Sequence, residues 1–431
     1  MRRTTIVRIA ALAAAVGVAS PALPAGFHIR EQGAKAMGMA NAFAAQADDP
    51  SAIFYNPAGL AFQEGTQASL GVTIIQVPET EFEGKTWLGD PRVSGSEFSG
   101  KQSARPDIFF PPNMYFTTSL RSVPVALGVG INSQYPLAKR WDTTSPFRDD
   151  VKEVAIKPIN VNPTVAYRWK TLGLAFGLNY TYATLWLENA PYTTVYDGSG
   201  TPVNLNVGDL EVEGTGDGWG FNFGLLWRPS ETWSFALAYR SRIKVEVKDG
   251  DADLMVSQKA QETLGLPSHV NTDGSTEITL PDTWTFAVAW KPTNRITLEF
   301  DADRFGWSSY DELKLDFEDE SVLHDETLPK DWKDVWAFRF GVQYALTDAL
   351  DLRAGYTYDN TPVPDSTLGP DLPDSDRHNV TFGVGWHTDR GSVDFAYMAV
   401  LFKDRSVSND HQDGEYRSEA HLFALNVSYR F

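Results

Sequence analysis

GFHIREQGAKAMGMANAFAAQADDPSAIFYNPAGL, residues 26–60, is the least strand-like stretch of the chain. Small residues recur closely between Ala34 and Ala45, and two turn signals follow, Asp48-Asp49-Pro50 and Asn56-Pro57. The remainder of the chain is mostly alternating in polarity and rich in aromatic residues. We therefore predict that residues 26–62 form a compact helical plug and that residues 63–431 form a β-barrel around it.

The composition favours membrane strands over membrane helices. The 431-residue chain is 42% hydrophobic and 13% aromatic, yet its mean hydropathy is only -0.29. A strand with one face in lipid and the other in water spreads its apolar residues among polar ones, which produces this combination. No apolar run long enough to span a membrane as a helix lies beyond the first residues.

Several classes of site are excluded by residue counts. The chain has no Cys, which rules out a disulfide framework and a thiolate metal site. Its 7 His are scattered without a pair at metal-ligand spacing. The net charge of -19 argues against nucleic acid as a partner. We expect no cofactor and no metal centre.

The N-terminus carries an export signal. Arg2, Arg3 and Arg8 precede an apolar segment, residues 9–18, and small residues follow at Ala22 and Ala25. The alternative, a membrane-anchoring helix, is disfavoured because the apolar segment is short and polar chain follows at once. Residues 1–25 are therefore predicted to be a signal peptide.

Period-two alternation divides the rest of the chain into about fourteen strands, an even number, as in single-chain bacterial barrels. The predicted strands are residues 66–77, 113–121, 124–134, 155–169, 171–188, 206–228, 232–247, 276–290, 295–305, 333–344, 349–358, 378–387, 392–402 and 416–431. In the last of them, Phe423, Leu425 and Val427 alternate with Ala424, Asn426 and Ser428. A soluble β-sandwich is the alternative interpretation of the alternation alone.

The connections alternate between short and long along the chain. One to four residues join some strands, for example residues 229–231, whereas residues 78–112 and 306–332 form long connections. This asymmetry is typical of an outer-membrane barrel with tight periplasmic turns and extended outer loops. It predicts that both termini lie in the periplasm and that the plug enters the lumen from that side.

Several motifs resemble those of the FadL-type family of long-chain fatty acid transporters, which also includes uptake channels for toluene-like aromatics. The resemblance is carried by Ala25-Gly26-Phe27, the small-residue stretch, Asn56-Pro57-Ala58, PNMYFTTSL at 112–120 and GVGINSQYPLAKRW at 128–141. The ending Tyr429-Arg430-Phe431 resembles the aromatic signal read by the barrel-assembly machinery, so Phe431 is the expected assembly signal.

The resemblance implies passive transport of hydrophobic small molecules such as long-chain fatty acids, without enzymatic activity. Such a molecule would bind among the outer loops, pass to a lumen pocket against the plug, and leave sideways through a gap at a kinked third strand. Phe27, Asn56, Pro57 and Ala58 are the expected plug and ligand-binding residues. Outer-membrane lipid and lipopolysaccharide would surround the barrel, and each CH₂ buried against protein gains about 0.8 kcal/mol.

The expected lateral gate is Tyr135-Pro136-Leu137. Family members that this chain resembles have a glycine at the kink, where this sequence has Pro136. Proline lacks the amide hydrogen and interrupts a strand ladder, so it preserves the same physical effect. An equally good interpretation is that Pro136 simply ends the strand.

The sequence does not decide whether the cargo is charged or neutral. Fatty acid carriers of the family hold the carboxylate with basic lumen residues, one near the end of the fifth strand, but residues 182–189 contain no Lys or Arg. Neutral aromatic hydrocarbons or alkanes are therefore an alternative cargo. Arg240, Arg242 and Arg339 are candidate lumen charges, although lumen arginines commonly pair with wall carboxylates instead.

Two further functional classes are alternatives to transport. A loop-active lipase-type enzyme would need a nucleophile motif near His324, His378 or His411, and none is present. A structural barrel or adhesin would not need the plug. The acidic loop segments, such as residues 316–320, are either solvated loops or holders of divalent cations that bridge to lipopolysaccharide.

Overall fold

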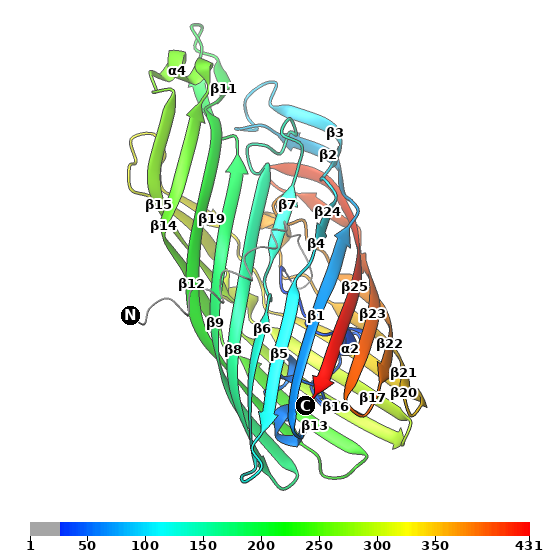
Figure 1. The fold of residues 1–431 in the computed structure, drawn as a ribbon. Coiled ribbons are helices and arrows are strands. Elements are labelled where there is room, and N and C mark those ends of the chain that lie inside the picture. Colours follow the sequence, from blue (N-terminus) through cyan, green and yellow to red (C-terminus); the bar gives the residue numbers. More distant parts are fainter. Residues whose placement is uncertain (1–25) are drawn as a thin grey trace, which may run out of the picture.

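In the computed structural model, which describes residues 26–431, the chain forms a closed antiparallel barrel of 14 strands around an N-terminal plug (Figure 1). The predicted signal peptide, residues 1–25, lies outside the described residues. Strand β1 pairs with β25 from Gln67–Arg430 to Gln76–His421, which closes the wall. The wall consists of β1 (Thr66–Val77), β5 (Pro112–Ser119), β6 (Val125–Asn132) continued by β7 (Leu137–Arg140), β8 (Glu153–Trp169), β9 (Leu172–Asn189), β12 (Gly208–Trp227), β13 (Trp233–Arg240) continued by β14 (Ile243–Val256), β15 (His269–Leu280) continued by β16 (Thr283–Thr293), β17 (Ile296–Phe305) continued by β18 (Glu312–Phe317), β20 (Val335–Thr347), β21 (Leu350–Asp359), β22 (Arg377–His387), β23 (Gly391–Phe402) and β25 (Gln412–Arg430).

The long connections contain structure that the alternation pattern did not predict. They form β2 (Thr80–Trp87), β3 (Glu97–Ser103), β4 (Asp107–Phe109), β10 (Tyr192–Tyr196), β11 (Pro202–Asn206), β19 (Glu326–Pro329), β24 (Arg405–Ser408) and the helix α4 (Gln258–Leu264). Figure 1 shows α4, β11, β2 and β3 at one end of the barrel, with the C-terminus and the short turns at the other. Several of these short strands pair with upward extensions of wall strands, as β2 does with β25.

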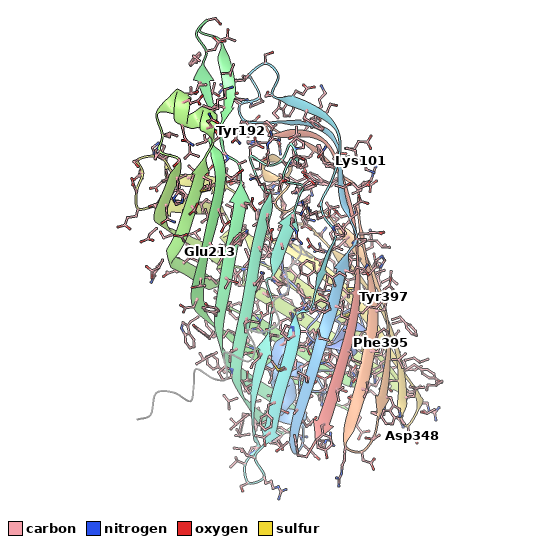
Figure 2. The ribbon with its side chains drawn as sticks, turned by 45° about the horizontal axis from the view of Figure 1, so that its top comes forward. Lys101, Tyr192, Glu213, Asp348, Phe395 and Tyr397 are labelled. Atoms are coloured by element: carbon pink, nitrogen blue, oxygen red, sulfur yellow. The ribbon has the colours of Figure 1, made fainter. Side chains whose placement is uncertain are left out.

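The two faces of the wall differ as the alternation predicts. On β25, Leu425 and Val427 are exposed, 47% and 51%, whereas Leu422 and Asn426 are buried. Phe395 and Tyr397 point away from the wall on β23 (Figure 2). Large apolar side chains on the outside therefore meet lipid, and small or polar side chains face the lumen.

The plug consists of short helical segments rather than one long helix. These are α2 (Ala34–Met37), α3 (Ala52–Tyr55) and the 3-10 helix η1 (Pro57–Phe62). Among residues 26–431, no helix is both long and apolar enough to pass through a membrane. Small residues allow the plug to approach the wall closely: a Cβ on Gly355 of β21 would lie 2.5 Å from the backbone of Met39.

Buried polar groups of the wall hold the plug in place. Asp301 of β17 accepts hydrogen bonds from the amides of Phe43 and Ala44, each at 3.1 Å. Glu299, two residues earlier on the same face, accepts from the amides of Ala45 and Gln46 at 2.6 and 3.0 Å. These amides are free of helix bonding, so the carboxylates satisfy donors that would otherwise be buried and unpaired.

The last strand also contributes to the seat of the plug. The amide of Ala34, the first residue of α2, donates to Asn426 Oδ1 of β25 at 2.8 Å, across a sequence separation of 392 residues. The plug and the last strand therefore meet inside the barrel.

Candidate functional site

Phe27, at the start of the plug, is surrounded by four aromatic side chains, which we call the aromatic cage: Tyr135, Trp307, Tyr310 and Trp332. Phe27 is 1% exposed, and its ring centroid lies 5.0 Å from Trp307, 5.8 Å from Trp332, 6.1 Å from Tyr310 and 6.3 Å from Tyr135. Trp307 belongs to the 3-10 turn η2 (Trp307–Ser309), which is inserted between β17 and β18 and brings the indole into the lumen. These rings therefore enclose the side chain at the start of the plug.

The Asn56-Pro57-Ala58 turn ties the plug together and to the wall. Asn56 Oδ1 accepts from the amide of Ala58 at 3.2 Å and so caps η1, with Pro57 at its first position. Its Nδ2 donates to the carbonyl of Ala44 at 2.8 Å and to that of Leu225 in β12 at 3.2 Å. A Cβ on Gly224 would lie 2.2 Å from Asn56 Oδ1, so the wall has a glycine where the turn approaches.

The third wall strand is interrupted where the sequence has Pro136. Strand β6 ends at Asn132 and β7 begins at Leu137, and residues 133–136 are buried. The carbonyl of Gln134 accepts from the amide of Ile29 at 2.7 Å, and the carbonyl of Ser133 accepts from Gln32 Nε2 at 2.5 Å. The interruption is therefore turned inward and hydrogen-bonded to the plug.

The interruption leaves a gap in the strand ladder. Strand β5 pairs with β6 from Ser119–Ala126 to Met114–Ile131, and β7 pairs with β8 from Leu137–Ile156 to Arg140–Glu153. Within residues 26–431, no strand pairing joins β7 to β4 or β5. Above the gap, Arg105 N donates to Arg140 O at 2.8 Å, and the Arg140 side chain pairs with Asp107 of β4 at 2.6 Å, so the two sides are joined there.

The three candidate lumen arginines have different surroundings. Arg339 is buried and bonded to Asp303 at 2.7 Å, as expected of a wall ion pair. Arg242 does not face the same side as Arg240, because the strand is irregular between β13 and β14; its side chain is 51% exposed and bonds Asp282 at 2.9 Å. Arg240 is buried and donates to the side-chain oxygen of Asn179 and to the carbonyl of Phe54.

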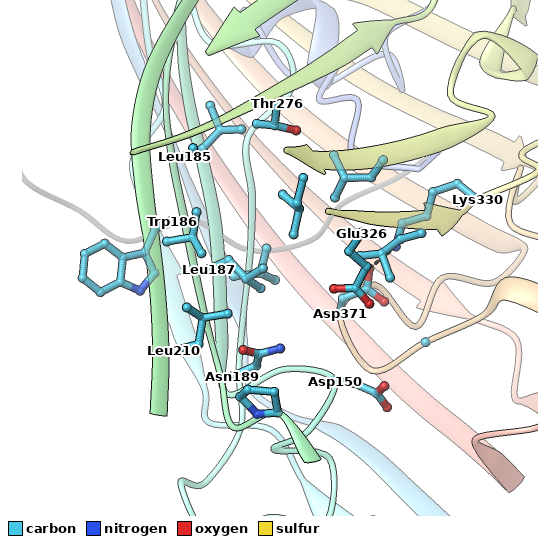
Figure 3. A pocket seen from close by; sticks show the side chains of 18 of the residues that line it. Asp150, Leu185, Trp186, Leu187, Asn189, Leu210, Thr276, Glu326, Lys330 and Asp371 are labelled. Atoms are coloured by element: carbon cyan, nitrogen blue, oxygen red, sulfur yellow. Dashed lines mark hydrogen bonds and ion pairs between the residues drawn. The ribbon is translucent and has the colours of Figure 1, made fainter. Parts of the chain in front are cut away.

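A cavity of about 490 Å³ lies on the outer side of the cage, a volume in the range of small-molecule sites. Aliphatic side chains from several wall strands line it, including Leu137, Ile156, Leu185, Leu187, Ile278 and Leu313. Figure 3 shows Leu185, Leu187 and Leu210 on one side of the cavity and Glu326, Lys330 and Asp371 on the other. Tyr310 lines the cavity and also touches Phe27, so the cage forms its inner end.

The charged side of the cavity is mainly acidic. Lys330 is the one Lys or Arg among the described lining residues, and its Nζ lies 2.8 Å from Asp371. Burial works against the charge of Lys330, but Asp371 outweighs it and raises the pKa of the ammonium group. Burial, together with Asp149 and Asp371, raises the pKa of the Asp150 carboxyl, and burial raises that of Glu326.

The histidines considered for enzymatic activity are dispersed. His324 and His411 line the cavity, whereas His378 is bonded to the hydroxyl of Tyr356 at 2.6 Å at an exposed position. In the part of the chain that the structure describes, no group of three or more His, Cys, Asp or Glu has the arrangement of a metal site.

Sequence reasoning missed most of the aromatic cage and the basic residue that lines the cavity. Trp307, Tyr310, Trp332 and Lys330 all lie in or beside the connection of residues 306–332, which alternation marked only as a loop. The signal that could have identified them is the density of aromatic residues in that connection, since exposed loops seldom need buried rings.

Comparison with known proteins gives a consistent result. The family described as "Outer membrane protein transport protein (OMPP1/FadL/TodX)" matches residues 15–431. The chain is 24% identical over 465 aligned positions to the long-chain fatty acid transport protein of Escherichia coli K12, with all of both chains covered. It is 26% identical to outer membrane protein P1 of Haemophilus influenzae, covering 94% of this chain and 95% of that one.

Solved structures agree on the fold. A FadL homologue from Pseudomonas aeruginosa superimposes with a TM-score of 0.81 at 20% identity, covering 94% of this chain and 100% of that one. The toluene transporter TbuX of Ralstonia pickettii has a TM-score of 0.66 at 15% identity, covering 93% and 98%.

Proposed function

The chain belongs to the outer membrane protein transport protein family (OMPP1/FadL/TodX), and from this premise we propose the route and the kind of cargo. It is a bacterial outer-membrane transporter of hydrophobic compounds. The proposed route runs from the outer cavity, past Phe27 and its aromatic cage, to the break in the third strand, where cargo leaves sideways into the membrane. The end with the short turns and the C-terminus is proposed to face the periplasm.

The observation that supports this route is that the outer cavity, the aromatic cage and the break in the third strand adjoin one another. Leu137 lines the outer cavity and is also the first residue of β7 after the break. Tyr135, inside the break, touches Phe27, which in turn touches Tyr310 at the inner end of the cavity. Movement of Phe27, together with the segment of residues 133–136 that is hydrogen-bonded to the plug, is the step that we propose connects the cavity with the gap beside β7. An apolar path of this kind replaces water as the solvent for the cargo, so no energy source is needed.

We propose that the cargo is aliphatic and uncharged. The lining is predominantly aliphatic, and each CH₂ transferred from water to such a surface gains about 0.8 kcal/mol. Asp149, Asp150, Glu326 and Asp371 outnumber Lys330, which Asp371 already neutralises. A carboxylate would find no unpaired Lys or Arg among the described lining residues, and burial would penalise its own charge.

A long-chain fatty acid anion is the second candidate. Relatives that match over their whole length are named long-chain fatty acid transport proteins. In this case Lys330 would exchange Asp371 for the carboxylate of the cargo, which makes Lys330 the residue that separates the two candidates.

Uptake by cells that lack their own carrier tests the route. Radiolabelled oleate, hexadecane and toluene are supplied to cells with the wild type, with Pro136→Ala, or with residues Phe27–Arg30 deleted. We expect both variants to lose uptake severalfold, because the first restores an amide donor at the break and the second removes the contact between cavity and gap. Pro163→Ala, at an exposed proline in β8, is the matched control and should transport as the wild type does.

The outcomes separate route and cargo. Transport that survives both changes, in barrels shown to be assembled, contradicts the route. Loss of oleate uptake alone in Lys330→Met favours the fatty acid anion, whereas uptake of hexadecane but not oleate by the wild type favours the uncharged cargo.

A further inference from the structure

Below the aromatic cage, the plug and the wall bring two guanidinium groups to one aromatic ring. The Arg30 guanidinium of the plug lies 6.0 Å from the centroid of the Phe54 ring, and that of Arg240, from β13, lies 5.3 Å from it. Both arginines are buried. Two buried positive charges that approach the same ring repel each other, and an anion beside them would relieve this repulsion.

The carboxylates in contact do not balance these charges. Asp303 binds Arg30 at 3.1 Å and also Arg339 at 2.7 Å, so a single carboxylate serves two guanidinium groups. Arg240 forms no ion pair with any carboxylate within residues 26–431; its described partners are Asn179 and the carbonyl of Phe54. A buried charge without a counter-ion is costly, since burial removes the hydration that stabilised it.

Two buried hydrogen-bond donors near these arginines have no partner. Among the described residues, Arg30 Nε and Thr283 Oγ1 are buried without a hydrogen-bond partner. Both residues line a cavity of about 20 Å³, together with His28, Arg240, Asn222 and Thr285, which is room for one particle of about the size of water.

The surroundings of His28 indicate positive potential at this cavity. Burial, followed by the charges of Arg30, Arg339 and Arg240, lowers the pKa of the His28 imidazole well below its ordinary value. His28 is therefore neutral at physiological pH and adds no further positive charge, while the arginines remain.

We propose that this cavity binds one small inorganic anion of the halide class, held by Arg30 of the plug and by Arg240 and Thr283 of the wall. The unbalanced guanidinium charge favours an anion over a water molecule. A volume of about 20 Å³ suits a monatomic ion better than a carboxylate that carries an alkyl chain, so the proposed ion is distinct from the cargo. Because its ligands come from both plug and wall, the anion fastens the plug at this point.

Anomalous diffraction from crystals of the intact protein grown in sodium bromide tests the site directly. We expect a bromide peak within hydrogen-bonding distance of Arg240 and Thr283 in the wild type. Arg240→Gln should abolish the peak, and Thr283→Val, which removes only one neutral donor, should lower its occupancy. The matched control is Arg353→Gln, since Arg353 is an equally buried lumen arginine that pairs with Asp351 and Asp394; it should keep the bromide peak.

A solution measurement accompanies the diffraction. Hydrogen exchange at the amides of residues 28–32 should be severalfold slower in chloride than in gluconate, which is too large to enter, and this difference should vanish in Arg240→Gln but not in Arg353→Gln. Absence of bromide from the wild-type site, a water molecule there in its place, or equal exchange in chloride and gluconate would overturn the proposal. If Arg240→Gln does not assemble, the wild-type peak and the Thr283→Val crystals decide the outcome.

Discussion

At the scale of single residues, Phe27 contacts both Tyr310, which lines the cavity, and Tyr135, which lies at the strand break. Replacing this fully buried ring with alanine leaves a cavity in the cage, a change that typically costs about 3–5 kcal/mol. We expect Phe27→Ala to free the first turn of the plug, so that the amide of Ile29, which bonds Gln134 O, exchanges at least about 100-fold faster. Hydrogen exchange followed by mass spectrometry measures this change.

Phe147→Ala is the control for that experiment. Phe147 is as buried as Phe27, but it packs against Phe82, Trp141 and Tyr416 instead of the plug. Unchanged exchange at Ile29 in Phe27→Ala would show that the cage does not hold the segment.

A second prediction concerns Asp49, in the turn before α3. Burial raises the pKa of this carboxyl from 3.8 to about 6. Burial also acts to raise the pKa of the neighbouring Asp48, but Lys35, 2.8 Å away, outweighs it and lowers that pKa to about 2, so Asp48 stays ionised. A carboxyl whose pKa is higher in the folded state binds its proton more tightly when folded. The plug should therefore become more stable as the pH falls from about 6 towards 4.

Asp49→Asn should remove this dependence. The measurement is the difference in amide exchange of residues 52–56 between variant and wild type at each pH. Asp348→Asn, in an exposed turn at the opposite end from Lys101 (Figure 2), serves as the control. A wild-type plug that loosens between pH 6 and 4 would contradict the assignment.

Sequence reasoning about single residues succeeded where a local motif was present. Asn56-Pro57 forms the predicted stop, because its cap needs only neighbouring residues. Arg242 differs from the expectation, since strict alternation has no means of indicating the irregularity that turns it outward. The partners of Arg240 and Lys330 lie far away in sequence. No pattern along the chain therefore reveals whether either charge is paired with a carboxylate.

At the scale of elements, β17 acts as the anchor of the plug. The carboxylates of Glu299 and Asp301 together receive four plug amides. A hydrogen bond to a charged group contributes about 1.5–3 kcal/mol, so Asp301→Ala should speed exchange at Phe43 and Ala44 by roughly 10- to 100-fold. The same variant should make cells more sensitive to small hydrophilic antibiotics, because a loosened plug admits water.

The control for β17 is Asp394→Ala. Asp394 is also buried in the lumen, but it binds Arg353 at 2.7 Å rather than plug amides. If both variants change exchange at Phe43 equally, the effect is general loosening of the lumen and not loss of an anchor.

Element boundaries show what alternation can and cannot predict. Residues 66–77 match β1 at both ends, because one face meets lipid along the whole strand and the period of two is uninterrupted. The predicted strand at residues 232–247 is instead two strands, β13 and β14, that together run to Val256. Beyond the membrane both faces contact protein or water, the contrast between faces disappears, and β2, β3 and β10 escape detection for the same reason.

At the scale of the whole molecule, the C-terminal residue is expected to direct assembly of the barrel into the membrane. Phe431 is 74% exposed and follows directly after β25, with its amide bonded to Thr66 O at 2.9 Å. If it is the signal read by the assembly machinery, deletion of Phe431 should lower the amount of barrel in the outer membrane severalfold. Heat-modifiable migration of membrane fractions measures assembled protein. Phe431→Trp, which keeps an aromatic end, should assemble normally, and full assembly after the deletion would contradict the assignment.

The hydrogen bond between Ala34 and Asn426 has a consequence for the order of events in time. A ribosome makes residue 34 long before residue 426, so the plug exists while its final partner does not. Contacts of such wide sequence separation form late, and β25 also closes the wall by pairing with β1. Closure of the wall and completion of the plug's contacts with it thus become one step, and a chain that lacks β25 can complete neither.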